Sequence, residues 1–479
     1  MGSQKNKLNK IIFVILSVMF IIPSSIYIIQ KKTILGFDIY YNFFITENIS
    51  KTISTIIYLI LFSLMSITYL KIVKNKKEFD TIKELLKYIA IISIIFTFML
   101  PWTSSDIFYY MGVGEFDSVY KQNPYYITMK DYYEQNPESI NNDSIFEQGV
   151  NNFWANTTVV YGPIAQIIFK ICTTLSFKNI NICLFIFKAL NIVIHILNCY
   201  LIFKLTKKFK FSMIYGLNPF VLFEFIGMLH NDIIVIFFIL LTIYYLTKKK
   251  NIYLSILFLA LATGIKYFTV LLLPVVILYH FREETKISKR ILRCIQYGIM
   301  FLCIILVEYI PYLQNIEVVL AMLPQTARYS KSIYSAMSVI DGNLMIILRG
   351  IFILAFLGYY IICCLKMLLD KENNIMKMLR EYNISLILFM LILTNCQQWY
   401  IVWLFATLMW QRPNMIRNII GISLATEIAN GIYMFKSEWY VYDVYYIEII
   451  VFLLALWYVF TNKKYIKDRR RQIEKASIN

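Results

Sequence analysis

The stretch LLKYIAIISIIFTFMLPWTSSD, residues 85–106, joins an apolar run to the start of a polar segment. Its first part, Leu85–Leu100, carries one charge and approaches the roughly 20 residues that a helix needs to cross a bilayer core. A helix satisfies its own backbone hydrogen bonds, which lipid cannot do, so we expect a membrane-spanning helix here. Asp106 then stands at the bilayer surface, where an ionisable group is costly and points to function.

Other apolar blocks repeat this pattern along the chain, namely Ile11–Ile29, Ile182–Phe203 and Val441–Phe460. The 479 residues are 59% hydrophobic and 16% charged, whereas soluble domains average about 25% charged residues. A membrane β-barrel would instead alternate in segments of about ten residues. The first block is long for a signal peptide and no A-x-A-like site follows it, so we interpret it as a retained span. The sequence predicts an all-α, polytopic membrane protein.

The net charge of +18 is spread over short basic patches that alternate with pairs of apolar runs. Such alternation is the positive-inside pattern that orients membrane proteins. A nucleic-acid-binding protein would concentrate its basic residues on one face, so we expect no nucleic acid partner. The patches, all assigned to the cytoplasm, are Lys5–Lys10, Lys71–Lys87, Lys204–Lys210, Lys248–Lys250, Arg282–Arg293, Lys366–Arg380, Arg412–Arg417 and Lys463–Lys475.

This charge pattern predicts about 14 spans, with a range of about 12–14, and both termini in the cytoplasm. The expected spans lie near 11–30, 52–73, 84–102, 180–203, 212–229, 232–247, 252–266, 267–281, 294–312, 343–365, 381–396, 399–411, 416–435 and 441–461. The apolar segment 161–176 must then be an interfacial or re-entrant helix on the outer face, opened by Gly162-Pro163, since Pro is tolerated in a first turn. A large first loop, 103–156, and a second loop, 314–343, also face outward.

Polar side chains gather on this outer face. Asp106 is the first candidate, although Ser104, Ser105 or Asp106 could simply cap a short helix through Tyr110. The other candidates have plain alternatives too: a turn with a helix cap for His230-Asn231-Asp232, a snorkelling cation for Lys266, a solvated charge for Arg328 and an aromatic belt for Gln398-Trp399. Together they offer carboxylates for proton abstraction, cations for a phosphate leaving group and aromatic rings for sugars.

Other kinds of site lack a signature in the sequence. The eight cysteines fall in or beside apolar segments, as buried hydrophobic residues do. There are three histidines and no HExxH motif, so we predict no dedicated transition-metal site and no cofactor. The acidic outer loop leaves room for a divalent cation, Mg or Mn, because oxygen ligands leave no spacing pattern. No GxxxxGK[ST] or GxGxxG motif indicates nucleotide binding.

An ordered series of short motifs, spread over residues 84–411, resembles the GT-C superfamily of membrane glycosyltransferases. The resemblance is strongest to bacterial polyprenyl-phosphate-mannose-dependent mannosyltransferases. The residues that carry it are Asp106, Tyr110, Asn123-Pro124-Tyr125, Tyr161-Gly162-Pro163, Asn218-Pro219, His230-Asn231-Asp232, Gly264-Ile265-Lys266 and Gln398-Trp399-Tyr400. The chain departs from the family's paired-acid pattern, because no Asp lies two residues from Asp106, and Glu115 and Asp117 are the nearest alternatives for the base.

The resemblance implies a GT-C-like catalytic core over 84–411, preceded by two spans in 1–83 and followed by spans and a basic tail in 412–479. It implies transfer of a mannose-like hexose from a polyprenyl-phosphate donor to a glycan, glycolipid or protein hydroxyl outside the cytoplasm. Asp106 would be the general base, and Lys266, Arg328 and His230 would neutralise the donor phosphate. Asp232 would orient His230 or bind a sugar hydroxyl. The other sugar- or acceptor-binding candidates are Tyr110, Glu115, Asp117, Tyr125, Tyr161, Asn231, Gln398 and Trp399.

Two alternative functions stay open at this point. An envelope polysaccharide polymerase or ligase also has many spans and a large outer loop, but its loops would be rich in cations, whereas 103–156 is acidic. A lipid-linked flippase or transporter would carry buried charges in pairs within its spans. Lys188, His195, Glu224, Arg349 and Glu427 lie within apolar runs, and no pairing among them is readable from the sequence.

Overall fold

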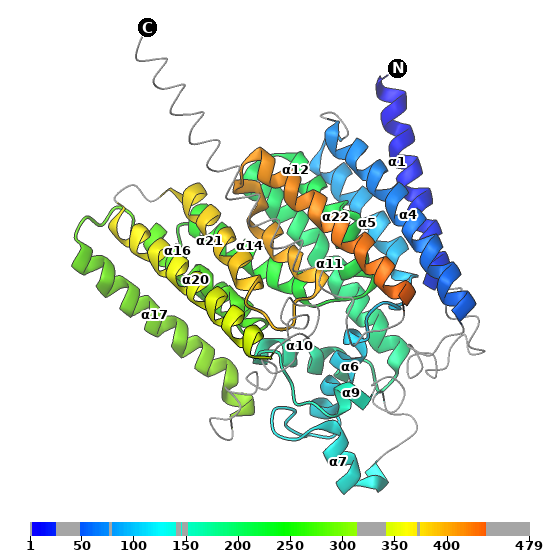
Figure 1. Cartoon of the computed structure of the whole chain (residues 1–479), viewed down its shortest axis with the longest axis horizontal. Helices are drawn as coiled ribbons and strands as arrows, with labels where there is room; N and C mark the ends of the chain where they lie inside the picture. Colours follow the sequence, from blue (N-terminus) through cyan, green and yellow to red (C-terminus); the bar gives the residue numbers. More distant parts are fainter. Residues whose placement is uncertain are drawn as a thin grey trace.

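The computed structural model describes residues 2–24, 48–75, 79–139, 145, 152–313, 342–370 and 374–436. Within these ranges the regular elements are helices and no strand occurs, which confirms the all-α prediction (Figure 1). They are α1 (Gly2–Met19), α4 (Asn48–Lys74), α5 (Ile82–Thr97), α6 (Asp106–Ser118), α7 (Met129–Gln135), η1 (Pro137–Ser139), α9 (Asn152–Ala155), α10 (Pro163–Thr174), α11 (Ile180–Thr206), α12 (Phe209–Gly216), α13 (Pro219–Val221), η2 (Leu222–Gly227), α14 (Asp232–Thr247), α15 (Ile252–Thr263), η3 (Tyr267–Leu272), α16 (Leu273–His280), α17 (Ile287–Tyr309), η4 (Ile310–Tyr312), α20 (Gly342–Leu369), α21 (Ile375–Met390), η6 (Gln398–Trp410) and α22 (Pro413–Lys436).

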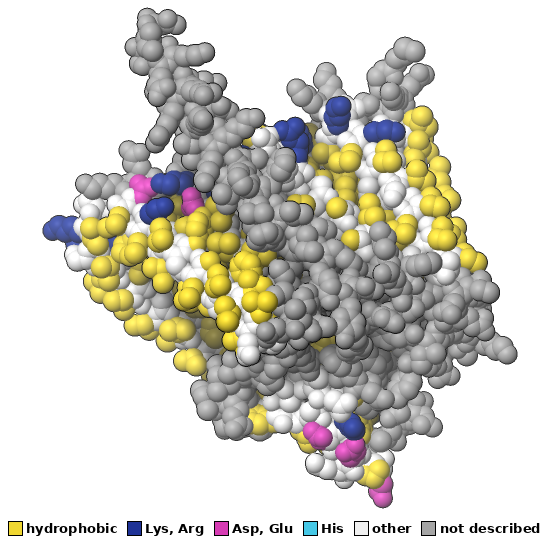
Figure 2. Space-filling view, in the orientation of Figure 1, with side chains coloured by type: hydrophobic (Ala, Val, Ile, Leu, Met, Phe, Trp, Pro, Cys, Tyr) yellow, Lys and Arg dark blue, Asp and Glu magenta, His cyan; other side chains and the backbone are white. Residues whose placement is uncertain are grey.

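Five helices of the described chain are long and apolar enough to cross a membrane, and a bent pair of shorter ones could make a sixth. The five segments are Lys7–Ser24, Thr52–Lys74, Ile180–Thr206, Ile287–Tyr312 and Gly342–Leu369. Figure 2 shows hydrophobic side chains over the flanks of the bundle and several Lys and Arg side chains near the end at which α1 begins. The chain is therefore a membrane protein, while the total of about 14 spans stays a prediction; the last expected span, 441–461, lies outside the described residues.

Helices α6, α7, α9 and α10 gather at the end of the bundle opposite the start of α1 (Figure 1). Helix α10 has 12 residues and begins at Pro163, so it extends only about 18 Å, short of the roughly 30 Å of a bilayer core. Helix α6 begins at Asp106, as expected, but continues to Ser118 instead of ending at Tyr110. It continues because nearly all its side chains are buried, and tertiary packing rather than local propensity stabilises helices of this length.

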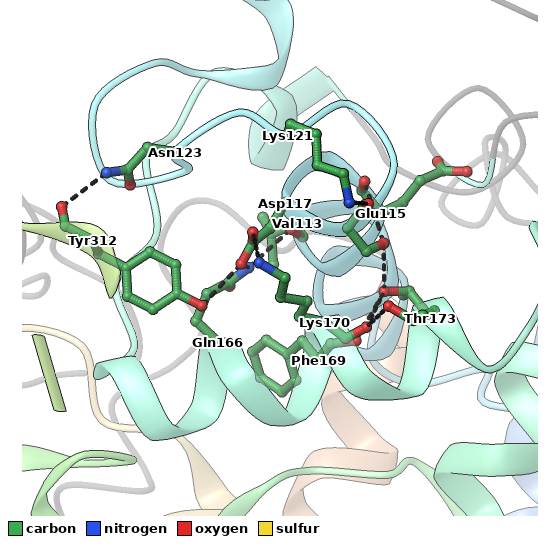
Figure 3. A network of polar contacts seen from close by, with 12 residues as sticks. Val113, Glu115, Asp117, Lys121, Asn123, Gln166, Phe169, Lys170, Thr173 and Tyr312 are labelled. Carbon is green, nitrogen blue, oxygen red and sulfur yellow. Dashed lines mark hydrogen bonds and ion pairs between the residues drawn. The ribbon is translucent and has the colours of Figure 1, made fainter. Parts of the chain in front are cut away.

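A polar network holds α6 against α10 (Figure 3). The Lys170 ammonium lies 2.6 Å from Asp117 Oδ1, and Gln166 Nε2 donates to the Val113 carbonyl at 3.0 Å. The hydroxyl of Tyr312, just after α17, donates to Asp117 Oδ2 at 2.8 Å. Asp117 thus joins three elements and fixes the helix that begins at Asp106.

The segment before the His230 turn is broken. Helix α12 and the stretch Pro219–Gly227 meet at 49°, because Pro219 has no N–H to donate and Asn218 instead caps the next turn by accepting from Phe220 N at 3.0 Å. The π-helix η2 follows, a form often found at functional sites. Leu229 then adopts a left-handed backbone, φ 68°, which is strained for a residue with a side chain. This backbone carries Glu224 and His230 into the bundle.

Two glycines, Gly162 and Gly264, bring the start of α10 against the end of α15. Ile164 N and Gly162 N donate to the carbonyls of Gly264 and Ile265 at 2.8 and 3.3 Å. A Cβ at Gly162 would stand 2.4 Å from the Gly264 oxygen, so the two backbones can approach only without a side chain there. The contact places Tyr161, at one side of the crossing, next to Lys266, at the other.

The η6 helix is an unusually long 3₁₀-helix, with 13 residues. Residues three apart eclipse one another in a 3₁₀-helix, so Tyr400 and Trp403 lie on one face. Their rings stack with centroids 4.3 Å apart, and Trp403 stacks in turn on Phe268 at 3.8 Å. An aromatic wall results beside the α15–η3 connection.

Candidate active site

Asp106 stands at the first position of α6, with its backbone N–H bonded to Ser104 Oγ at 3.3 Å. Its side chain is 13% exposed, and its Oδ2 lies 3.4 Å from His230 Nδ1. The N-terminal end of a helix stabilises a carboxylate through the helix dipole and the free N–H groups. Asp106 therefore lies at the end of the bundle formed by α6, α7, α9 and α10, and its carboxyl group can still be reached by a ligand.

His230 lies between two carboxyl groups in the turn between η2 and α14. Its Nε2 is 3.1 Å from Glu224 Oε2, on the side opposite Asp106, and its ring stacks on Trp399 at 3.7 Å. Burial lowers the pKa of His230, but Asp106 and Glu224 outweigh burial and raise it to about 9. His230 is thus an imidazolium near neutral pH, held between two acids and one aromatic face.

Asp106 and His230 form one part of the site, and Lys266 and Asp232 form a second part. The Lys266 ammonium lies 2.7 Å from Asp232 Oδ1, and the Trp403 indole N–H donates to the same oxygen at 2.6 Å. The ammonium also faces the rings of Tyr400 and Tyr161, at 4.9 and 5.8 Å from their centroids. Aromatic faces attract a cation and hold it in place without neutralising it. Lys266 keeps 12% of its side chain exposed, so an anion can approach it.

Tyr110 and Tyr161 connect the part of the site around Asp106 with the part around Lys266. The hydroxyls of Tyr110 and Tyr161 are 3.2 Å apart, and the Tyr110 ring stacks on Phe169 of α10 at 4.6 Å. Burial, followed by the charge of Asp106, raises the pKa of Tyr110. Burial also raises the pKa of Tyr161, with Tyr110 and Asp106 adding to it. Both therefore stay neutral phenols that can donate to or accept from a sugar hydroxyl.

Asn231 and Asp232 have unfilled hydrogen-bonding capacity at this site. Asn231 is 3% exposed, and neither its amide nitrogen nor its oxygen has a hydrogen-bond partner. The second carboxylate oxygen of Asp232, Oδ2, is buried and unpartnered as well. Buried polar groups are almost always satisfied, so such gaps are expected where a ligand supplies the missing partners.

Most of the predicted site residues meet at this place, and a few lie elsewhere. Asp106, Tyr110, Tyr161, His230, Asn231, Asp232, Lys266, Gln398 and Trp399 surround it, with Gln398 Nε2 donating to Glu224 Oε1 at 3.2 Å. Tyr125 lies behind Tyr161, and its hydroxyl donates a hydrogen bond to the Tyr161 carbonyl at 2.9 Å. Asp117 belongs to the α6–α10 network, about 16 Å along the helix from Asp106. Glu115 is buried on α6 near Asp117, and Arg328 lies outside the described residues.

Four residues at or next to the site were not among the predicted site residues, although Tyr400 belonged to the motif series and Glu224 and Glu427 were noted as charges within apolar runs. Tyr400 and Trp403 form the aromatic wall, and the repeated aromatic spacing in QWYIVW was the available signal. Glu224 and Glu427 lie next to each other although 203 positions separate them, and Glu427 accepts a 2.5 Å hydrogen bond from Tyr58. Within the ranges that the structure describes, no group of three or more His, Cys, Asp or Glu side chains is placed to bind a metal ion.

Comparison with known proteins gives one match. A family model described as alpha-(1->6)-mannopyranosyltransferase, N-terminal domain, matches residues 21–282, more than half of the chain. That range holds Asp106, Tyr161, His230 and Lys266, while the η6 wall lies beyond it. No curated protein and no protein of solved structure matches the sequence.

Proposed function

The chain belongs to the alpha-(1->6)-mannopyranosyltransferase family and is a membrane mannosyltransferase; from this premise we propose that its donor is a polyprenyl-phosphate mannose. The proposed acceptor is a sugar hydroxyl on a glycan or glycolipid, and the site faces away from the cytoplasm, with both termini inside. The family's printed name favours the 6-hydroxyl of a mannose as the acceptor group. A lipid-linked donor fits a site at the outer end of the bundle, where a polyprenyl tail can lie among the helices.

The observation that carries this proposal is the placing of Asp106 and Lys266 on two sides of one tyrosine-bridged site. In the proposed step, Asp106 takes the proton of the acceptor hydroxyl as that oxygen attacks the first carbon of mannose. The bond between this carbon and the phosphate oxygen breaks, and the electron pair leaves with polyprenyl phosphate. Lys266 neutralises the charge that develops on the phosphate. Attack opposite the leaving group inverts the anomeric carbon, so an α-linked product requires a β-linked donor.

The remaining side chains take supporting roles in the proposal. Asn231 and the free oxygen of Asp232 supply hydrogen bonds to sugar hydroxyls. Asp232 also holds Lys266 in position, because it bonds both the ammonium and the Trp403 indole. The contact with His230 that the sequence suggested for Asp232 is made by Asp106 and Glu224 instead. Tyr110, Tyr161 and the η6 rings provide aromatic surface for the sugar.

The test is transfer of labelled mannose from synthetic polyprenyl-phosphate mannose to methyl α-mannoside by the purified chain in liposomes. We expect Asp106→Asn to lower the transfer rate about 10²–10⁴-fold, the usual contribution of a general base. Asp131→Asn, a surface acid on α7, serves as the control and should keep most of the activity. Unchanged transfer by Asp106→Asn, or an equal loss with Asp131→Asn, would remove Asp106 as the base.

One observation keeps the transporter alternative in view. Glu224 and Glu427 are a buried pair of ionisable groups within apolar runs, which resembles the pairing that this alternative expects. The pair adjoins His230, however, and so belongs to the same site as Asp106. Movement of labelled lipid-linked mannose across vesicles without any acceptor would favour transport, and its absence together with acceptor-dependent transfer would exclude it.

A further inference from the structure

A row of buried polar side chains runs inward from the site. It starts at Asp106 and His230, continues to Glu224 on η2, then to Glu427 on α22, and ends at Tyr58 on α4. Glu224, His230, Glu427 and Tyr58 are each about 0% exposed. The row therefore connects the site with α22 and α4, two helices of the bundle that do not line the site.

The hydrogen-bond pattern assigns a different role to each oxygen of Glu427. Its Oε1 accepts from the Tyr58 hydroxyl at 2.5 Å and from Asn430 Nδ2 at 3.4 Å. Its Oε2 has no donor and is buried, and the neighbouring polar group is Glu224, itself a carboxyl. Two carboxyl groups in contact away from water do not both ionise, so one proton lies between them.

The surroundings decide which glutamate holds that proton. Glu224 faces two donors, the His230 imidazolium and the Gln398 amide, and these stabilise its ionised form. Glu427 faces Tyr58, Asn430 and Glu224, and no lysine, arginine or histidine of the described chain pairs with it. The proton therefore belongs on Glu427, at the oxygen that lacks a donor.

We propose that Glu427 is a positioning residue of the transferase: a neutral carboxylic acid that donates a hydrogen bond to Glu224 and keeps Glu224 ionised and fixed against His230. Tyr58 and Asn430 hold the other oxygen of Glu427 and so aim its proton. His230 in turn fixes the base, Asp106. This inference rests on the proposed function for its effect on transfer, although the protonation of Glu427 does not.

The proposal separates two substitutions that look alike. Glu427→Gln replaces a hydroxyl donor by an amide donor of the same shape, with the carbonyl oxygen still accepting from Tyr58. We expect this variant to transfer mannose within about threefold of the wild type. Glu224→Gln removes the charge beside His230, and Glu427→Leu removes the donor. Both should lower kcat about 10- to 100-fold, the effect of losing a hydrogen bond to a charged group, with little change in the KM for the donor.

The matched control is a second tyrosine–glutamate pair, Tyr359 and Glu381, whose hydrogen bond is also 2.5 Å long. Glu381→Gln should leave transfer unchanged. Tyr69→Phe controls for Tyr58→Phe, because Tyr69 is a buried tyrosine of the same helix that donates to the Ile214 carbonyl. We expect only Tyr58→Phe to lower kcat.

Infrared spectroscopy of the liposome-embedded chain tests the protonation without any activity. The C=O stretch of a protonated carboxylic acid should be present at pH 8 in the wild type and in Glu381→Gln, and should weaken in Glu427→Gln. A spectrum that does not depend on Glu427, or a folded Glu427→Gln variant as inactive as Glu224→Gln, overturns the inference. If the wild type transfers no mannose while the infrared signal behaves as expected, the proposed function fails and the assignment of the proton stands.

Discussion

His230 offers a quantitative prediction, because its protonation depends on two carboxyl groups that can be removed singly. Its pKa of about 9 exceeds the ordinary 6.5 although burial acts in the opposite direction. The difference corresponds to about 3 kcal/mol in favour of the imidazolium. Asp106→Asn and Glu224→Gln each remove one of the two favourable causes, which together also offset burial, so each should cost more than half of this net value, more than about 1.5 kcal/mol, and lower the pKa of His230. In the double variant burial is the remaining cause, so the pKa of His230 should fall below its ordinary value.

The same protonation makes stability depend on pH. A group whose pKa is raised on folding stabilises the folded state fully below its unfolded pKa, and the contribution disappears as the pH rises through the folded pKa. For His230 the stabilisation of about 3 kcal/mol is complete below pH 6.5 and is lost as the pH passes about 9. The thermal midpoint of the wild type should therefore fall between pH 7 and pH 10 by more than that of Glu224→Gln.

The direct assay is ¹⁵N NMR of histidine-labelled chain in liposomes, which is practical because the chain has only three histidines. A His230→Gln variant assigns the signal. Titration of the wild-type His230 signal at or below pH 6.5 would refute the reasoning, and so would a titration that neither Asp106→Asn nor Glu224→Gln moves downward.

Two further predictions concern the binding half of the site and its backbone support. Lys266→Gln should raise the KM for polyprenyl-phosphate mannose and lower kcat at least tenfold, because the charge that develops on the phosphate loses its cation. Lys170→Gln is the control and should leave the KM for the donor unchanged. Equal effects of the two variants in the transfer assay would contradict the role assigned to Lys266. Gly162→Ala should cost about 1–3 kcal/mol in thermal unfolding and reduce transfer, since its Cβ would meet the Gly264 carbonyl, while Gly298→Ala, with open space around it, should be neutral or slightly stabilising.

The sequence predicted best those features that depend on a residue and its neighbours along the chain. Leu85–Leu100 predicted a helix, which α5 confirms, and α6 begins at Asp106, one of the three residues expected to open a short helix. Gly162-Pro163 opened a short helix because Pro fits a first turn, and α10 begins at Pro163. The expected span 232–247 matches α14 to the residue. Each of these follows from local backbone chemistry and hydrophobic length.

Contacts between distant helices were beyond such reasoning. His230 and Lys266 were recognised as polar interruptions of apolar segments, but their partners depend on how helices pack. The contact between Glu224 and Glu427 requires a π-helix on one side and the packing of α22 on the other. Glu115 and Asp117 looked equivalent to Asp106 by charge, and only the direction of α6 and its packing against α10 separate them. Arg328 lies outside the described residues, so its place at the donor phosphate stays a prediction.

The Tyr58–Glu427 hydrogen bond also constrains the order in which the protein can assemble during synthesis. Its two partners are 369 positions apart in the chain. Ribosomes add about 5–20 residues per second, so Tyr58 enters the membrane roughly 20–70 seconds before Glu427 is synthesised. Once the Glu224 segment has also been made, it and α4 must leave a place for α22. The buried row from Asp106 to Tyr58 can therefore be completed only after α22 has been synthesised.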